Sequence, residues 1–240
     1  MISIENVDKF YKKKQVLHKF SMQVPLKENA VLGLIGPNGA GKTTVIKLMT
    51  GLLEYSSGSI SVNEEENYLS WCKENVVLVP VGERGLRYKN TVRDNVIFFS
   101  AMKGIDSKKV RDLLDEYAAV LHFNAFLDRR IETLSTGEKK KAMLLCGLCT
   151  DTRVIIMDEP SNGLDIDTQL EMKALVKELA LKYHKTFIIS SHDLAFLDGL
   201  ADKSIFLFNG RNTGEIKGQI GADQMREIYM QKKLEAENFI

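Results

Sequence analysis

One glycine-rich stretch constrains this sequence more than any other, and it reads Gly36-Pro37-Asn38-Gly39-Ala40-Gly41-Lys42-Thr43-Thr44. An apolar run precedes it and an amphipathic run follows it, so the pattern predicts a strand, a turn and a helix. The glycines let backbone N–H groups converge on phosphate oxygens, and the helix adds its positive end. Lys42 supplies an ammonium for the outer phosphates, and Thr43 a hydroxyl for Mg²⁺. The stretch therefore predicts a nucleotide-phosphate site; a purely structural glycine turn is the alternative.

The composition is that of an ordinary globular protein. The 240 residues are 44% hydrophobic and 27% charged, and 33 Lys and Arg stand against 32 Asp and Glu, for a net charge of +1. This balance supplies no overall field for nucleic acid. We find no apolar run of membrane-spanning length and no signal peptide, so we expect a cytosolic protein. Cys72, Cys146 and Cys149 are expected to be reduced. Cys146 and Cys149 have the spacing of half a zinc site, but we favour the interpretation that they are small buried residues of an apolar helix.

Strand-like and helix-like segments alternate along the chain. Runs 2–7, 16–24 and 58–62 predict an antiparallel sheet, and runs 76–81, 154–157, 187–189 and 205–208 predict buried strands. The block 91–148 has helical spacing without a strand signal, and 222–238 has the pattern of a charged helix. We therefore predict an α/β fold, with a mostly parallel sheet, helices on both faces, an N-terminal antiparallel β subdomain and a helical subdomain.

Two acids, Asp158 and Glu159, end the apolar run 154–157. Charges at the end of a buried strand are costly unless they serve a ligand, and ligands bind at that end of parallel sheets. We expect Asp158 to hold Mg²⁺ through water and Glu159 to polarise the water that attacks the γ-phosphate. His192 follows another apolar strand, where its imidazole could donate to the γ-phosphate. A histidine satisfied locally is the alternative.

The segment Leu134-Ser135-Thr136-Gly137-Glu138 begins a helical run. Ser135 could bind phosphate, and Gly137 would permit close approach of the backbone. Ser135 and Glu138 also have the spacing of a capping box, which is the structural alternative.

Taken together, these motifs resemble the nucleotide-binding domain of the ATP-binding-cassette (ABC) family, from residue 1 to about 214. The resemblance identifies the 36–44 stretch as a P-loop NTPase motif and 161–165 as the family's D-loop. It implies a nucleotide-binding domain over 1–215, with a helical subdomain at about 88–150, and a helical tail at 216–240. Tyr11 matches the aromatic residue that stacks on adenine; packing into the core is the alternative for it.

The resemblance also implies a mechanism. Two domains associate head to tail around two ATP molecules, so Ser135 and Gly137 act in trans and Asp165 lies at the dimer interface. Lys42, Glu159 and His192 are the implied catalytic residues, as phosphate ligand, general base and γ-phosphate switch. The implied cofactors are ATP and Mg²⁺. The implied partners are a second ABC ATPase subunit and separate integral-membrane permease subunits, which hold the protein at the inner face of the cell membrane.

Two departures from the family pattern affect the expected site. The signature segment has Thr136 and Glu138 where Gly and Gln are usual, and Glu138 brings negative charge that the lysines at 139–141 could offset. A usual Gln is replaced in the segment Val81-Gly82-Glu83. Valine cannot bind a metal, whereas the carboxylate of Glu83 suits Mg²⁺.

The sequence favours the ATPase subunit of an ABC transporter, with export preferred to import. A run like 82–86 occurs in family members that resemble export ATPases. One alternative is a soluble ABC protein acting on nucleic acid or ribosomes. Another is a small-molecule kinase or GTPase with the same phosphate loop, although no guanine-reading motif is present.

If Glu83 replaces the usual Gln, Glu83→Ala should slow ATP hydrolysis more than it weakens ATP binding, because a metal ligand acts mainly on the reacting phosphate. Steady-state turnover and nucleotide titration of both proteins measure the two effects. Equal turnover in mutant and wild type would rule out this role.

Overall fold

The computed structural model describes residues 1–26, 30–63, 67–82 and 85–237 of the chain. Its central sheet has six strands in the order β5-β6-β7-β3-β8-β9. Pairings between neighbours are parallel except for β8 with β9, which are antiparallel. The strands are β3 (Val31–Ile35), β5 (Val76–Val79), β6 (Val154–Asp158), β7 (Thr186–Ser191), β8 (Lys203–Phe208) and β9 (Arg211–Lys217).

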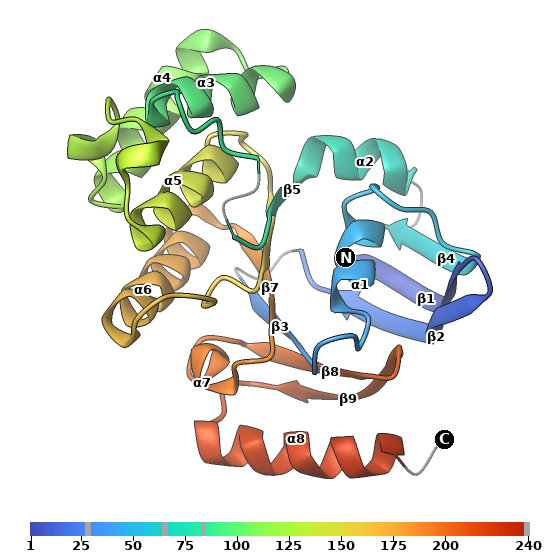
Figure 1. Ribbon diagram of the computed structural model, residues 1–240. Helices are drawn as coiled ribbons and strands as arrows, with labels where there is room; N and C mark the ends of the chain where they lie inside the picture. The colour runs from blue at the N-terminus through green and yellow to red at the C-terminus, as the bar shows by residue number, and fades with distance from the viewer. Residues whose placement is uncertain (27–29, 64–66, 83–84, 238–240) are drawn as a thin grey trace.

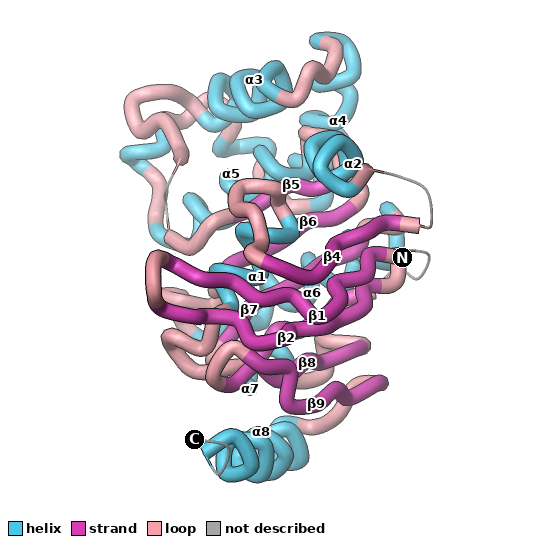
Figure 2. The backbone as a smooth tube through the Cα atoms, turned by 90° about the vertical axis from the view of Figure 1, so that its right-hand side faces the viewer, coloured by secondary structure: helices cyan, strands magenta, loops and turns pink. Residues whose placement is uncertain are grey.

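A second sheet has three strands in the order β2-β1-β4, and its two pairings are antiparallel. Figure 2 shows these strands side by side, with α1 behind them. The strands are β1 (Ile2–Tyr11), β2 (Lys14–Val24) and β4 (Ser57–Val62). Alternation in β1 turns Ile2 and Ile4 inward, each at most 1% exposed. The predicted N-terminal antiparallel sheet is confirmed.

The helices connect the strands of the central sheet and lie on both sides of it (Figure 1). A continuous block of helices separates β5 from β6, which confirms the absence of strands expected for 91–148. The helices are α1 (Lys42–Met49), α2 (Tyr68–Asn75), α3 (Val92–Met102), α4 (Ser107–Val120), α5 (Thr136–Leu148), α6 (Ile166–Tyr183), α7 (Leu194–Leu197) and α8 (Ala222–Glu237), with 3₁₀ turns η1 (Asn124–Phe126) and η2 (Ile131–Thr133).

The two faces of the central sheet belong to two different hydrophobic cores. On β3, Leu32 and Leu34 pack with the antiparallel sheet, α1 and α2, whereas Val31 and Ile35 pack with α3 to α8. The same alternation continues on β6, β7 and β8, since successive side chains of a strand point to opposite faces. The sheet thus separates α1 from α5, which decides where the phosphate-binding candidates lie.

Three features differ from the sequence expectations or extend them. The strand expected over 76–81 ends at Val79, because Pro80 has no N–H for the ladder. Helix α2 was not expected; it is capped by the Asn67 side chain, which accepts from two backbone N–H groups. Cys146 and Cys149 are buried beside the other apolar side chains of α5, as predicted. The boundaries proposed for the subdomains and the tail remain predictions.

Gly210 provides a test of how the β8–β9 turn supports the phosphate loop. Its N–H donates to Ala40 O at 3.0 Å, and its carbonyl accepts from the His18 N–H at 2.9 Å. Its φ is 73°, and an added Cβ would lie 2.0 Å from Val16 O.

We expect Gly210→Ala to lower the free energy of unfolding by more than about 3 kcal/mol, because left-handed strain of about 1–2 kcal/mol is joined by this collision. Gly199→Ala is the matched control, since Gly199 has φ 62° and open space around its Cβ. Chemical denaturation of both variants measures the difference, and equal losses would contradict the prediction.

Candidate nucleotide-binding and catalytic site

Helix α1 begins without a side-chain cap, in contrast to α2 through α7. Its N-cap residue is Gly41, with φ 111° and no side-chain hydrogen bond. A side-chain oxygen accepts a backbone N–H at the start of each of the other six helices. The uncapped N–H groups of α1 and the positive end of its dipole form an anion site. This is the position that the sequence predicted for phosphate.

Lys42 is buried at the first position of α1, with 6% of its surface exposed. Its ammonium donates to Gly36 O at 2.6 Å and Pro37 O at 3.2 Å, and lies 3.0 Å from Glu159 Oε1. The glycine-rich loop therefore wraps around its own lysine. A phosphate oxygen competes with two neutral carbonyls for this cation, and the charged oxygen is the stronger acceptor.

Glu159 connects the phosphate loop to His192. It is 9% exposed and has a left-handed backbone, φ 47°, directly after β6. Oε2 lies 2.8 Å from His192 Nδ1. Oε1 has the ion pair with Lys42 but no hydrogen bond within the described part of the chain. A buried carboxylate with a free acceptor suits a group that must take a proton from water.

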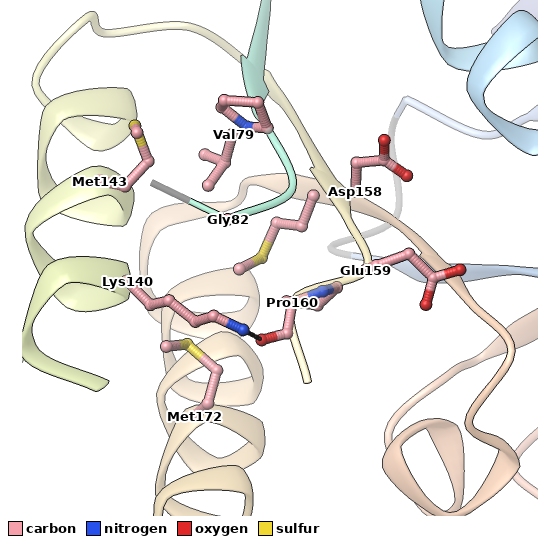
Figure 3. Close-up of a pocket in the computed structure, with 10 residues that line it drawn as sticks. Val79, Gly82, Lys140, Met143, Asp158, Glu159, Pro160 and Met172 are labelled. Atoms are coloured by element: carbon pink, nitrogen blue, oxygen red, sulfur yellow. Dashed lines mark hydrogen bonds between the residues drawn. The ribbon is translucent and has the colours of Figure 1, made fainter. Parts of the chain in front are cut away.

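Asp158 is held by the neighbouring strand β7. The Ser190 hydroxyl donates to Asp158 Oδ1 at 2.5 Å and accepts the Glu159 N–H at 3.1 Å. The two acids have different surroundings: Asp158 faces a hydroxyl, and Glu159 a cation and an imidazole. Figure 3 shows both carboxylates on the side of the strand end away from Lys140 and Met172.

The donors present fit Mg²⁺ that is also bound by nucleotide. Asp158 Oδ2 and the exposed Thr43 hydroxyl have no hydrogen bond to another described residue. Carboxylate and hydroxyl oxygens are the ligands that Mg²⁺ prefers, and it usually completes its shell with water and phosphate. The described residues contain no cluster of three or more His, Cys, Asp or Glu that would hold a metal alone. Glu83, the further candidate ligand, lies outside the described residues.

Ser135 and Gly137 lie on α5, whose apolar side chains belong to the core on the other face of the sheet from α1. The Ser135 hydroxyl accepts the Glu138 N–H at 3.3 Å, and the Glu138 carboxylate accepts the Ser135 N–H at 2.7 Å. The capping box that the sequence offered as an alternative is therefore present. The negative charge of Glu138 therefore interacts with the N-terminal end of its own helix. Glu138 Oε1 also lies 3.8 Å from Arg129 Nη1.

The remaining candidates occupy other parts of the surface. Asp165 is exposed and caps α6 by accepting the Thr168 N–H at 2.8 Å, which lowers the pKa of its carboxyl. Tyr11 is 41% exposed at the end of β1, so the alternative that Tyr11 packs into the core is wrong. The structure thus brings Lys42, Glu159 and His192 together and leaves Ser135, Asp165 and Tyr11 outside that cluster.

Ser190 is a site residue that was not predicted from the sequence. It lies two residues before His192, and the sequence pattern does not indicate which strand lies beside it. The parallel pairing of β6 with β7, with Asp158 opposite Ser190, creates its contacts. Two polar residues that end adjacent buried strands are the signal that could have found it.

We expect Ser190→Ala to lower the kcat of ATP hydrolysis about tenfold while ATP affinity stays within about twofold, because the hydroxyl orients both acids without reaching the nucleotide loop. Ser204→Ala is the matched control, a buried serine on β8, 2% exposed. Steady-state kinetics and nucleotide titration measure both quantities. A similar loss of kcat in the two variants would show that any buried serine of the sheet has this effect.

The sequence matches the family model described as ABC transporter over residues 17–162. It is 30% identical over 232 residues to the lantibiotic transport ATP-binding protein SrtF of Streptococcus pyogenes, which covers 95% of this chain and 96% of that protein. It is 32% identical over 236 residues to the Nod factor export ATP-binding protein I of Burkholderia orbicola, covering 95% of this chain and 76% of the relative.

Solved structures share the fold. The protein cbiO1 of Clostridium perfringens, described as part of an ABC transporter complex, superimposes with a TM-score of 0.82 at 22% identity, covering 97% of this chain and 92% of the other. A dimeric bacterial ABC transporter cassette superimposes with a TM-score of 0.77 at 21% identity, covering 90% of this chain and 98% of the other. The predicted ABC fold is confirmed. Family model, relatives and fold agree: the chain belongs to the ABC transporter family, as an ATP-binding subunit that hydrolyses ATP.

Proposed function

We propose that this chain pairs head to tail with a second ABC ATPase subunit and powers export through separate membrane subunits. One observation carries the pairing. The anion-binding end of α1 meets Lys42, Glu159 and His192 on one chain, whereas Ser135 and Gly137 stand on α5, which packs on the opposite face of the sheet. A single chain thus presents two separate half-sites, and a second chain supplies the missing half of each.

In this proposal Glu159 is the general base. Its Oε1 accepts a proton from the attacking water, and Lys42 leaves the carbonyls of the loop for the outer phosphates. Mg²⁺, held by Thr43, Asp158 and the phosphates, would neutralise charge on the phosphate oxygens. The protein's own contribution is positioning and fixed charge, as expected for phosphoryl transfer. Tyr11 would stack on adenine, and its exposed ring supports that role.

His192 has one ring nitrogen available for the γ-phosphate. Nδ1 faces the Glu159 carboxylate at 2.8 Å, so a neutral ring carries its proton there and leaves Nε2 as an acceptor. Nε2 donates to a phosphate only when the ring is doubly protonated or when Nδ1 leaves Glu159. His192 would therefore respond to the γ-phosphate by changing its contact with the base, as a switch requires.

Ser135 keeps the hydrogen that the trans contact needs. Its oxygen accepts the Glu138 N–H, and no described residue accepts from its hydroxyl. The hydroxyl proton can therefore be donated to a phosphate on the partner subunit while the cap stays in place. This supports Ser135 as a phosphate ligand in addition to its structural role.

Transport requires other chains. No helix in the described part of the chain is long and apolar enough to cross a membrane. We infer that permease subunits supply the channel and hold this chain at the inner face of the cell membrane. Export is favoured because one relative is named for Nod factor export.

Dimer formation tests the paired site. We expect Glu159→Gln to elute at 27.1 kDa without nucleotide and at twice that mass with ATP, because the amide cannot act as base and ATP persists between the subunits. Adding Ser135→Glu should abolish the shift, since a carboxylate repels the partner's phosphates. A Glu159→Gln protein that stays monomeric with ATP contradicts the proposal.

Co-purification tests the transporter role. We expect tagged wild-type protein to retain the membrane proteins encoded beside it, and those proteins in detergent to raise its ATPase rate severalfold. Glu159→Gln serves as the control that binds without turnover. Neighbouring membrane proteins that neither bind nor stimulate would overturn this role.

A further inference from the structure

Lys140 is a buried cation on α5 that the proposed mechanism does not use. It is 8% exposed, and its side chain runs beside Met172 to Pro160, just beyond the end of β6 (Figure 3). Nζ donates to Pro160 O at 2.6 Å and also to Asn162 O. No carboxylate of the described residues lies within ion-pair distance of it. A buried ammonium without an anion is costly, so its two carbonyl contacts need a reason.

The segment that Lys140 binds lies between the candidate catalytic residues and the candidate interface. Residues 160–165, called here the β6–α6 loop, begin directly after Glu159 and end at Asp165, the cap of α6. The Asn162 N–H donates to Glu159 O at 3.3 Å. A shift of the loop therefore moves the backbone of the general base.

The start of α5 also packs on α6 beyond this loop. A Cβ on Gly137 would lie 2.9 Å from Thr168 Cγ2, so the first turn of α5 touches the first turn of α6. Lys141 contacts Glu171 on α6 at 2.5 Å. Lys140 differs from these contacts because it binds the loop backbone itself, and binds it from inside the protein. Lys140 thus contacts the β6–α6 loop and Lys141 contacts α6, so neither ammonium pairs with the Glu138 carboxylate.

We propose that Lys140 is a positioning residue that couples the two half-sites of one subunit. Its ammonium ties the helix that begins at Ser135 and Gly137 to the β6–α6 loop, which directly follows Glu159 and ends at Asp165. When the partner's phosphate engages Ser135, the resulting movement of α5 reaches Glu159 through the Pro160 and Asn162 carbonyls. This inference rests on the proposed head-to-tail dimer and adds the internal link between binding in trans and hydrolysis in cis.

The charge state of Lys140 suits this role at neutral pH. Burial lowers the pKa of its ammonium to about 8, so the group is charged at pH 7. A charged ammonium donates up to three hydrogen bonds, enough for both carbonyls. The surrounding pocket is lined by Asp158 and Glu159 at one end and otherwise mainly by apolar residues, Val79, Met143, Met157 and Met172 among them, so it accepts an apolar side chain of similar length.

Lys140→Met tests the coupling, because methionine fills the pocket without donating. At pH 7 we expect kcat for ATP to fall at least about tenfold, with ADP affinity within about twofold. In the Glu159→Gln background we expect the ATP-dependent dimer to require at least about tenfold more protein. Lys140→Arg, which keeps the charge and donors, should recover part of kcat. Lys141→Met is the matched control and should stay within about twofold of wild type.

The outcomes separate this inference from the proposed function. If Glu159→Gln with Lys140 intact stays monomeric in ATP, the proposed function fails. If it dimerises, and Lys140→Met has wild-type kcat and dimer affinity, the coupling by Lys140 is wrong. If Lys140→Met lowers ADP affinity by as much as it lowers kcat, the coupling by Lys140 is also wrong, because a general destabilisation of the fold would lower both. Should Lys140→Met not fold, Lys140→Gln, which keeps an N–H donor, carries the same comparison with an intermediate loss expected.

Discussion

The buried contact between Glu159 and Lys42 holds the site together. Glu159 directly follows strand β6 and Lys42 begins helix α1; the carboxylate and the ammonium lie 3.0 Å apart, with the two side chains 11% and 7% exposed. Each charge offsets part of the burial cost of the other, since breaking a buried pair leaves an uncompensated charge. His192 and the Ser190 hydroxyl surround Glu159. The arrangement fixes the proposed general base, the lysine of the glycine-rich loop and the histidine relative to one another.

The order of strands explains why these residues meet. β3, β6 and β7 are neighbours in the parallel sheet, so the phosphate loop, the acidic pair and His192 all emerge at the carboxyl edge. The alternation of side chains then assigns the two faces of the sheet to different cores. α1 and α5 end up on opposite faces, and this separation is the basis of the proposal that a second chain completes each nucleotide site.

Local patterns in the sequence were enough to predict most of this fold. The apolar runs give the strands, the glycine-rich stretch gives the loop before α1, and the Ser135–Glu138 spacing gives the capping box. The roles of Ser190 and Lys140 were not predictable, because both depend on neighbours about twenty to thirty residues away whose register only folding defines. A lysine in a run of three has the pattern of a solvated surface, yet the middle one is buried.

The two helix ends proposed to bind phosphate have different surroundings, and this difference favours one order of binding. α1 has no side-chain cap, so a nucleotide meets free N–H donors and a lysine already in the loop. α5 is closed by its own Ser135 and Glu138, and the carboxylate there weakens the attraction for phosphate. In the proposed dimer, the nucleotide therefore binds first to α1, and α5 of the partner adds affinity only once ATP is in place. Glu138 weakens this second step, so closure of the proposed dimer depends on the hydrogen bonds that the γ-phosphate accepts at α5, and ADP, which lacks that phosphate, leaves the dimer open.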